Sequence, residues 1–517
     1  MHTLTDAVTV GVGPLSFTDV VRVAREAAAV EIAPESWTEV RRSRAVIEAL
    51  ANDEAPHYGV STGFGALATR HIPVESRTQL QRSLIRSHAA GSGPEVEPEV
   101  VRALMLLRIS TLATGRTGVR AETLAAYVDL LNAKITPVVP EYGSLGCSGD
   151  LAPLAHCALA LMGEGTVRAS AGERQPAAEA LASAGLAPIT LAEKEGLALI
   201  NGTDGMLGML VLAITDLRQL VRVADITAAM SVEGLLGTDD VFAADLHSLR
   251  PHPGQVTSAA NLRALMARSE IRESHRTKAC TRVQDAYSLR CSPQVAGAVR
   301  DTIAHAAAVA EIELGAAIDN PVITQDGRVE SNGNFHGAPV AYQLDFLAIA
   351  VADLASIAER RTDRFLDRAR SSGLPPFLAD DAGVDSGHMI AHYTAAAIVS
   401  EMKRLAVPAS VDSIPSSAMQ EDHVSMGWSA GRKLRLAVDG LTRVLAVELL
   451  TAARGIELRA PLSPSPSTGA VIAALRSAGV PGPGTDRWLA PEIEIAVDLI
   501  RTGAAVAAAE AVVGPLA

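Results

Sequence analysis

The 517-residue chain has few aromatic side chains, little cysteine and no concentrated positive charge. Phe, Trp and Tyr together make up 3% of the sequence, so the core must be built mainly from Ala, Leu, Val and Ile. Because Ala and Leu are strong helix formers, this composition favours a helical protein. With 48% hydrophobic and 20% charged residues, the chain is expected to be globular rather than disordered.

The chain lacks several sequence patterns that are typical of disulfide frameworks, nucleic-acid or membrane binding, and metal sites. The four cysteines form no C-x-x-C pair and no disulfide framework, which favours a reducing, cytoplasmic location. The net charge of −13, without a Lys/Arg block, makes nucleic acid and anionic membranes poor partners. No H-E-x-x-H motif occurs, and the helical pair His388 and His392 has no evident third ligand, so we expect no catalytic metal.

The apolar stretches of the chain are interrupted by charged residues. Residues 1–21 do not have the charged-then-apolar pattern of a signal segment. Residues 197–230 contain Asp204, Asp216 and Asp225, so we expect a buried helix there rather than a membrane span.

Regular apolar spacing predicts a mainly α protein with a few short strands. Apolar residues recur every three or four positions at 101–112 and 207–221, which is typical of helices that bury one face. The best strand pattern is at 321–330, where Asp326 and Gly327 predict the turn of a small hairpin. We predict an N-terminal lobe at 1–199, which carries two glycine-rich loops, and a long helical bundle at 200–517, joined in one helical body.

The most informative of these loops reads Glu-Tyr-Gly-Ser-Leu-Gly-Cys-Ser-Gly-Asp at 141–150. Its three glycines indicate a tight backbone that needs small residues. Either Ser148 or Asp150 could cap the helix that is predicted to begin after the loop. The hydrolase elbow G-x-S-x-G is not matched, because Ser148 is followed directly by Gly149. On pattern alone, the plain interpretation is a glycine-rich loop that caps a helix.

The loop also resembles the signature of the histidine/phenylalanine/tyrosine ammonia-lyase family, whose fold is a fumarase-like bundle of long helices. The resemblance implies that Cys147, Ser148 and Gly149 cyclise into 4-methylidene-imidazol-5-one (MIO), an electrophile that no standard side chain provides. The amide nitrogen of Gly149 would attack the carbonyl carbon of Cys147, and Ser148 would lose its hydroxyl, so that two waters leave. The commonest triplet begins with Ala, but Cys147 contributes only its carbonyl to the ring.

A second loop, at residues 58–65, resembles the tyrosine loop of the same family. Alone, the segment would be interpreted as a turn with a packing tyrosine. The resemblance implies that Tyr58 removes the β-proton of the substrate. An unperturbed phenol, with a pKa of about 10, is a poor base at neutral pH, so we expect the pKa of Tyr58 to be lowered.

Polar motifs further along the chain resemble substrate-binding positions of the family. Asn201, which could simply cap the apolar helix after it, is implied to contact the MIO or the substrate amine. Gln284, Tyr287 and Arg290 are three apart and would share one face of a helix, where a solvated surface is the plain alternative. The resemblance implies that Arg290 binds the substrate carboxylate through two parallel hydrogen bonds, Tyr287 lies beside the MIO and Gln284 supports the site.

The remaining motifs bear on the carboxylate and the ring of the substrate. Asn320 is implied to assist the carboxylate and Phe335 to stack on the ring, although both motifs also suit ordinary turns. His88 and Glu421 resemble the histidine branch of the family, while Met419 stands where that branch commonly has Asn. A carboxylate can accept an imidazole N–H, whereas a phenyl ring would leave it unpaired at a cost of about 1–3 kcal/mol.

Together the resemblance implies an enzyme that eliminates ammonia from L-histidine to give trans-urocanate, after the substrate amine adds to the MIO. It also implies a homotetramer whose sites draw on more than one subunit. Two alternatives remain open at this point. One is a lyase or 2,3-aminomutase that acts on tyrosine or phenylalanine, and the other is a helical scaffold without activity.

Overall fold

The computed structural model describes residues 7–53, 57–63, 65, 70–170, 172–277, 280 and 283–517. The protein is mainly helical with a few short strands, which confirms the predicted fold class. Its contacts divide it into two compact units, each assembled from three segments of the chain. Unit 1 comprises Met1–Leu212, Ala307–Asp345 and Pro408–Arg432. Unit 2 comprises Ala213–Ala306, Phe346–Val407 and Lys433–Ala517.

Unit 1 carries short and medium-length helices together with small sheets. Its helices are α1 (Phe17–Arg25), α2 (Pro34–Ala51), η2 (Val74–Ser76), α3 (Arg77–His88), α4 (Pro98–Ala113), α5 (Ala121–Asn132), α6 (Leu151–Leu161), α7 (Ala177–Ser183), α8 (Glu195–Ile200) and η5 (Ser417–Met419). Its strands are β1 (Val8–Val10), β2 (Val30–Ile32), β3 (Ser92–Glu95), β4 (Thr136–Pro137), β5 (Pro140–Tyr142), β6 (Thr166–Arg168), β7 (Arg174–Pro176), β8 (Val322–Ile323) and β9 (Val329–Glu330). The apolar spacing at 101–112 therefore belongs to a helix, α4, as predicted.

The strands of unit 1 pair in four small sheets. Strands β1 and β2 are parallel, β3 pairs with β5 antiparallel, and β4, β6 and β7 form a three-stranded antiparallel sheet. Strands β8 and β9 form the predicted hairpin, with Ile323 opposite Val329. Its turn includes Gly327 at a φ of 85°.

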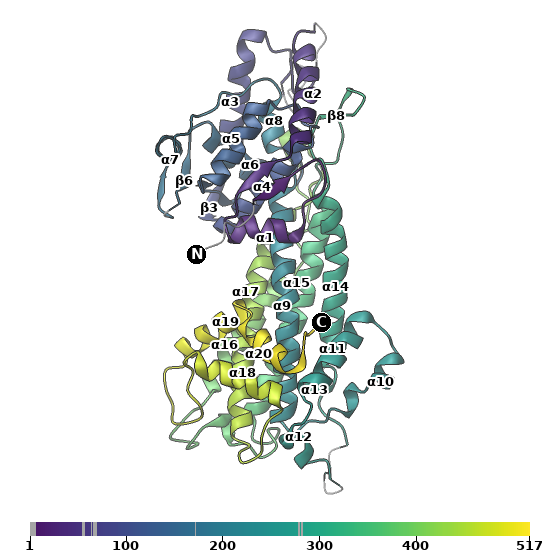
Figure 1. The fold of residues 1–517 in the computed structure, drawn as a ribbon, viewed down its shortest axis with the longest axis vertical. Helices are drawn as coiled ribbons and strands as arrows, with labels where there is room; N and C mark the ends of the chain where they lie inside the picture. The colour runs from purple at the N-terminus through teal and green to yellow at the C-terminus, as the bar shows by residue number, and fades with distance from the viewer. Residues whose placement is uncertain are drawn as a thin grey trace. The chain divides into compact units, whose positions relative to one another are not determined.

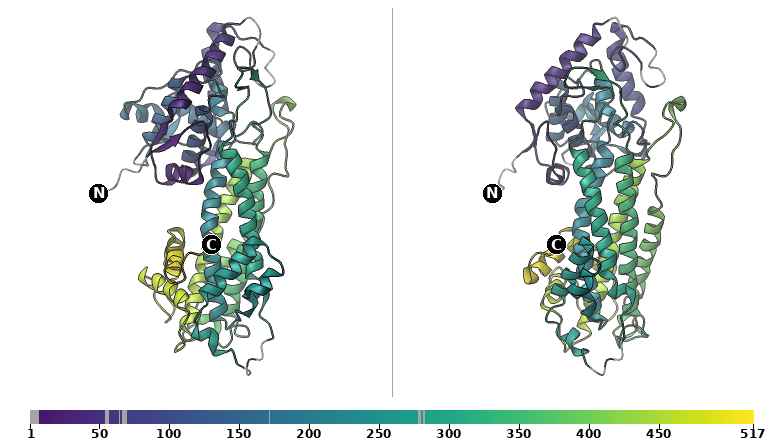
Figure 2. Two further views of the ribbon diagram at one scale, coloured as in Figure 1. Left: turned by 45° about the vertical axis from the view of Figure 1, so that its right-hand side comes forward. Right: turned by 90° about the vertical axis from the view of Figure 1, so that its right-hand side faces the viewer.

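Four long helices contribute residues to both units: α9 (Asp204–Gly234), α14 (Ser292–Leu314), α15 (Ala338–Leu366) and α17 (Gly427–Glu457). Within unit 2 they lie side by side (Figure 1), and the two further directions of Figure 2 show the same arrangement. Helix α9 is buried on nearly all of its faces, as expected for a helix that is apolar all round.

Two helical stretches are long and apolar enough to cross a membrane, Glu195–Gly234 and Ala338–Leu366. The most apolar window of the first is 100% buried inside the protein, and that of the second is 61% buried. Core helices of globular proteins have the same composition, and the burial of Glu195–Gly234 agrees with the predicted buried helix.

Unit 2 surrounds the long helices with shorter ones. These are η3 (Asp240–Phe242), α10 (Ala244–Ser248), α11 (Pro253–Leu265), α12 (Glu270–Ser274), α13 (Tyr287–Arg290), η4 (Pro376–Leu378), α16 (Met389–Leu405), α18 (Pro466–Ser477), α19 (Ala490–Arg501) and α20 (Ala504–Val513).

A buried ion pair joins two of the long helices inside unit 2. Arg361 of α15 donates from Nη2 to Oε2 of Glu448 on α17 at 2.9 Å, and the side chains are 1% and 0% exposed. Ser231 of α9 donates to the same carboxylate at 2.8 Å. Arg361 also lies 3.4 Å from the carbonyl oxygen of Ser288 and 3.3 Å from Oγ of Ser292. The pair and its hydrogen bonds therefore connect all four long helices and the short helix α13.

We expect Arg361→Met to destabilise the protein strongly, because it leaves the charge of Glu448 buried without its partner. Breaking such a pair costs about 3–5 kcal/mol, whereas replacing both members by apolar residues is often neutral. The double variant Arg361→Met/Glu448→Leu should therefore recover most of the lost thermal stability. Thermal unfolding of both variants at one protein concentration measures this. Equal melting temperatures for Arg361→Met and the native protein would contradict the assignment.

Candidate active site

The glycine-rich loop at 143–149 is anchored to the start of α9 by Asp150. Oδ2 of Asp150 accepts hydrogen bonds from the backbone N–H groups of Gly205 (3.0 Å) and Met206 (2.9 Å). Oδ1 accepts a hydrogen bond from Oγ of Ser144 at 2.9 Å. Burial raises the pKa of Asp150 to about 7, against these hydrogen bonds. Asp150 is the N-cap residue of α6, as the sequence allowed, but its side chain makes no capping bond there and instead caps α9.

Position 149 tolerates only glycine. Gly149 has a φ of +75°, and a Cβ there would lie 2.1 Å from the carbonyl oxygen of Gly202. The backbone N–H of Asp150 donates to the same oxygen at 2.7 Å. The loop therefore lies directly on the backbone of residue 202. Its residues fit the requirement of an internal cyclisation, in which the attacking amide must belong to a residue without a side chain.

The other side of the loop is held by residues from the later segments of unit 1. The carbonyl oxygen of Gly146 accepts hydrogen bonds from Oγ of Ser425 (2.8 Å) and from the backbone N–H of Gly337 (3.1 Å). Met426 N–H donates to the carbonyl oxygen of Leu145 at 2.9 Å. Cys147 is buried within this framework, and burial raises the pKa of its thiol. Two independent anchors therefore fix the loop, one from α9 and one from residues 337 and 425–426.

Ser148 opens onto a cavity of about 630 Å³ in unit 1. Six of the residues that the sequence analysis proposed for the site line this cavity: Tyr58, His88, Ser148, Asn201, Asn320 and Glu421. They come from segments that are far apart in the sequence, and the cavity brings them together. Apolar side chains such as Leu84, Leu151 and Leu197 line the rest of the wall, together with Arg70.

Hydrogen bonds fix which way the two asparagine amides point. Nδ2 of Asn201 donates to the carbonyl oxygen of Asn320 at 3.0 Å, which can only accept, so Oδ1 of Asn201 is left as an acceptor. Oδ1 of Asn320 accepts from the backbone N–H of Asn332 (3.0 Å) and from Ser331 Oγ (3.1 Å), so its Nδ2 remains a donor. Asn201 is the C-cap residue of α8, whereas the sequence suggested a cap for the helix after it.

Tyr58 is half-buried, and its phenol oxygen accepts a hydrogen bond from the backbone N–H of Gly65 at 3.3 Å. Burial raises the pKa of Tyr58 above its usual value; the Gly65 hydrogen bond opposes this shift, and the charges of Glu421 and Asp319 add to it. The expectation from the sequence that the pKa of Tyr58 is lowered is therefore wrong for the single chain. The phenol is harder to ionise than a free tyrosine and is a stronger base once ionised. Residue 64 of the same loop lies outside the described residues.

His88 and Glu421 both line the cavity. His88 is the last residue of α3, and its Nδ1 lies 2.9 Å from the carbonyl oxygen of Leu84. Burial lowers the pKa of His88, although Glu421 acts in the opposite direction. Oε2 of Glu421 is buried, and no described residue donates a hydrogen bond to it. The preceding residues Ser417–Met419 all have positive φ values between 50° and 71°, so Glu421 follows a strained turn.

Three other residues from the sequence analysis, Gln284, Tyr287 and Arg290, belong to unit 2 and do not line this cavity. Helix α13 begins at Tyr287, so the expectation that all three share one helical face is wrong for Gln284. Tyr287 is 71% exposed, and the Arg290 guanidinium lies 4.6 Å from the centre of its ring. Oδ2 of Asp285 accepts the backbone N–H of Thr238 at 2.7 Å, which fixes the segment before the helix.

Phe335 belongs to unit 1. It is half-buried and is not among the residues that line the cavity.

A buried ion pair next to Asn320 was not apparent from the sequence. Nζ of Lys194 lies 2.5 Å from Oδ2 of Asp319, and both side chains are fully buried. Oδ1 of Asp319 accepts the backbone N–H of Asn320 at 2.7 Å. The pair therefore positions Asn320. The acidic residue directly before Asn320 was visible in the sequence, but its partner, 125 residues away, was not.

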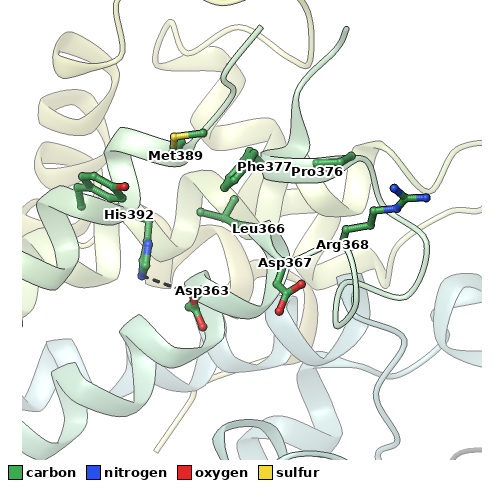
Figure 3. Close-up of a pocket in the computed structure, with 9 residues that line it drawn as sticks. Asp363, Leu366, Asp367, Arg368, Pro376, Phe377, Met389 and His392 are labelled. Carbon is green, nitrogen blue, oxygen red and sulfur yellow. Dashed lines mark ion pairs between the residues drawn. The ribbon is translucent and has the colours of Figure 1, made fainter. Parts of the chain in front are cut away.

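Unit 2 contains another cavity, of about 450 Å³, which Figure 3 shows with His392 directed towards Asp363. Nε2 of His392 lies 2.6 Å from Oε1 of Glu359 and 3.9 Å from Oδ1 of Asp363. His388, by contrast, is buried with its Nδ1 3.1 Å from Oγ1 of Thr451. The two histidines therefore have separate partners. Within the described ranges, no three His, Cys, Asp or Glu residues are grouped so as to hold a metal ion.

Comparison with known proteins decides the family. Residues 15–477 match the aromatic amino acid lyase family. The chain belongs to the aromatic amino acid lyase family.

The histidine ammonia-lyase of Streptomyces avermitilis is 65% identical over 517 residues, which is 100% of both chains. That of Streptomyces coelicolor is 64% identical over 516 residues, with the same coverage. The solved structure of histidine ammonia-lyase from Trypanosoma cruzi has a TM-score of 0.90 at 39% identity and covers 98% of this chain and 96% of that one. A tyrosine aminomutase from Streptomyces globisporus has a TM-score of 0.91, also at 39% identity, with 98% and 99% covered.

Membership in the aromatic amino acid lyase family confirms the resemblance found in the sequence. The fold is the long-helix bundle of these lyases and aminomutases. Lyases of this family depend on MIO.

We expect the stability of the protein to report the ionisation of Asp150. The folded-state pKa of about 7 lies above the ordinary value of 3.8, so the contribution of the protonated form is complete at low pH and is lost as the pH rises from about 4 to 7. Asp150→Asn keeps an acceptor for Gly205 and Met206 and does not titrate. The stability of the native protein relative to this variant should fall by up to about 4 kcal/mol across that range.

Thermal unfolding of both proteins between about pH 4 and pH 8 measures this difference. Asp150→Ala, which removes the acceptor altogether, should be less stable than Asp150→Asn at every pH, by about 1–3 kcal/mol. Parallel pH profiles for the native protein and Asp150→Asn would contradict the account of the buried carboxylate.

Proposed function

We propose that the chain is a histidine ammonia-lyase, which eliminates ammonia from L-histidine and releases trans-urocanate, the first step of histidine degradation. The observation that carries the proposal is the 64–65% identity, over the full length, to relatives that bear this name. The cavity chemistry supports it, because His88 and Glu421 suit a ring with two nitrogens rather than a hydrocarbon ring. The proposed location is the cytoplasm.

The proposed cofactor is MIO, formed from Cys147, Ser148 and Gly149. It supplies the electrophile that activates the α-amine of the substrate as a leaving group. The close approach of Gly149 to Gly202 and the two anchors of the loop support this assignment, because cyclisation requires a fixed and compact backbone. The position of Ser148 on the cavity wall supports an electrophile that is accessible to the substrate.

The remaining residues of the cavity bind the substrate and move its proton. Oδ1 of Asn201 accepts a hydrogen bond from the α-amine, since its Nδ2 is already engaged. Nδ2 of Asn320 donates to the carboxylate, since its Oδ1 is already engaged. Tyr58, half-buried on the same wall, removes the β-proton. The raised pKa of Tyr58 means that its ionised form is a strong base in this site.

Gln284, Tyr287 and Arg290 complete the site from a neighbouring subunit of a homotetramer. Gln284 and Tyr287 are exposed on unit 2 and Arg290 is half-buried beside them, which supports this role, because exposed polar side chains can enter the site of another copy. The Arg290 guanidinium packs on the Tyr287 ring, so the two side chains would arrive together. Arg290 then pairs with the substrate carboxylate, while Phe335 contacts the ring.

A tyrosine-specific lyase or aminomutase is the nearest rival, because a tyrosine aminomutase shares the fold at a TM-score of 0.91. Purified enzyme given L-histidine, L-tyrosine or L-phenylalanine separately tests the proposal, with products followed by ultraviolet absorbance and chromatography. We expect urocanate from histidine and no product from the other two. Coumarate, cinnamate or a β-amino acid would contradict the substrate assignment. Ser148→Ala should be inactive on all three.

Replacing Glu421 by Gln tests the role of the carboxylate. The substitution removes one charged hydrogen-bond acceptor, and the loss of such a hydrogen bond costs about 1–3 kcal/mol. We therefore expect kcat/KM for histidine to fall about tenfold to a hundredfold. Glu179→Gln, at an exposed position of α7, is the matched control and should leave kcat/KM unchanged. Equal kcat/KM values for Glu421→Gln and Glu179→Gln would contradict a role of Glu421 in binding the substrate.

A further inference from the structure

The ring end of the cavity carries two hydrogen-bond acceptors. One is the carboxylate of Glu421, and the other is a ring nitrogen of His88. Both groups line the same cavity, and the charge of Glu421 acts on the His88 ring. The other ionisable groups that face this end are Tyr58 and Arg70 on the cavity wall and Cys147 close to Glu421.

The hydrogen bonds of His88 determine which of its nitrogens carries a proton. Nδ1 lies 2.9 Å from the carbonyl oxygen of Leu84, and a carbonyl oxygen can only accept. Ser87 Oγ, 3.1 Å from the same nitrogen, donates its own hydrogen to Leu84 at 3.0 Å and can only accept from His88. Nδ1 is therefore the protonated nitrogen. Because burial lowers the pKa of His88, the ring is neutral near pH 7, and its Nε2 is left with a lone pair.

Glu421 is the second acceptor. Its Oε2 is buried, and in the part of the chain that the structure describes no group donates to it. The carboxylate lines the cavity, and a ligand that displaces water from it has to supply a donor, because a buried acceptor without a donor is costly. A ligand that fills this end of the cavity therefore has to provide N–H or O–H groups to both Glu421 and His88.

A neutral imidazole ring cannot satisfy both acceptors, because it has one N–H and one lone pair. An imidazolium ring has two N–H groups. We propose, on the basis of the proposed histidine ammonia-lyase function, that the cavity binds the ring of the substrate as imidazolium, donating one N–H to Glu421 and the other to Nε2 of His88. The positive charge of the ligand ring and the negative charge of Glu421 then balance each other inside the cavity.

This arrangement affects both selectivity and chemistry. The phenol of tyrosine has one donor and would leave one acceptor unpaired, and the phenyl ring would leave both unpaired. A positively charged ring also withdraws electrons from the adjacent β-carbon and makes its proton more acidic. That effect assists Tyr58, whose ionisation burial makes more difficult.

The proposal predicts that binding takes up a proton above the pKa of the free ring, which is about 6.5. The probe is 3-(imidazol-4-yl)propionate, which has the ring and the carboxylate of the substrate but no amine, and therefore cannot react. Titration calorimetry of the native enzyme near pH 8, in two buffers of different protonation enthalpy, should show an uptake of about one proton per site. The affinity should fall about tenfold per pH unit above neutrality.

Two controls separate the ring from the rest of the site. Glu421→Gln should bind the probe with almost no proton uptake, because a neutral amide no longer stabilises the charged ring. The ligand 3-phenylpropionate should bind to the native enzyme without proton uptake, since it has no ring nitrogen.

Binding of the imidazole probe near pH 8 without proton uptake would overturn the proposal, as would its failure to bind near pH 6. Either result, obtained with an enzyme that still forms urocanate from histidine, would refute the charged ring and leave the proposed function intact. An enzyme that forms no urocanate would refute the proposed function itself.

Discussion

The carboxylate of Asp150 links the glycine-rich loop at 143–149 to the N-terminus of α9, and the geometry of the site depends on this link. The first N–H groups of a helix have no partners within it, and Asp150 satisfies those of Gly205 and Met206. The backbone immediately after Asn201 is thereby held against Gly149, whose lack of a side chain allows the contact. The loop, the end of α8 and the start of α9 therefore form one rigid corner of the cavity.

From this corner the polar groups of the cavity divide into donors and acceptors. Asn201 presents an acceptor and Asn320 a donor, because their other amide atoms are bound to the backbone. His88 and Glu421 line the same cavity, and in the proposed function they accept hydrogen bonds from the substrate ring. This set of donors and acceptors matches an amino acid whose amine and ring can donate hydrogen bonds and whose carboxylate can only accept them. Tyr58 lies on the same wall, and burial raises its pKa, so in the proposed reaction a more acidic β-proton would assist it.

Local patterns predicted the local structure well. The apolar spacing gave α4 and α9, and Asp326-Gly327 gave the β8–β9 hairpin, because these signals depend only on neighbouring residues. The family motifs named six residues that line one cavity. What the sequence could not give depends on distant contacts: that the side chain of Asp150 bonds to the start of α9 rather than to α6, that Lys194 pairs with Asp319, and that three segments make up each unit. The burial that raises the pKa of Tyr58 is likewise a property of the folded wall.

The account rests on the conversion of Cys147, Ser148 and Gly149 into an electrophile at the wall of the cavity. The intact mass of the purified native protein tests this most directly. If the triplet cyclises and Ser148 loses its hydroxyl, the measured mass will lie below that of the unmodified chain by two waters, about 36 Da. The deficit should map to the peptide that contains residues 147–149. A mass equal to that of the unmodified sequence would contradict the account.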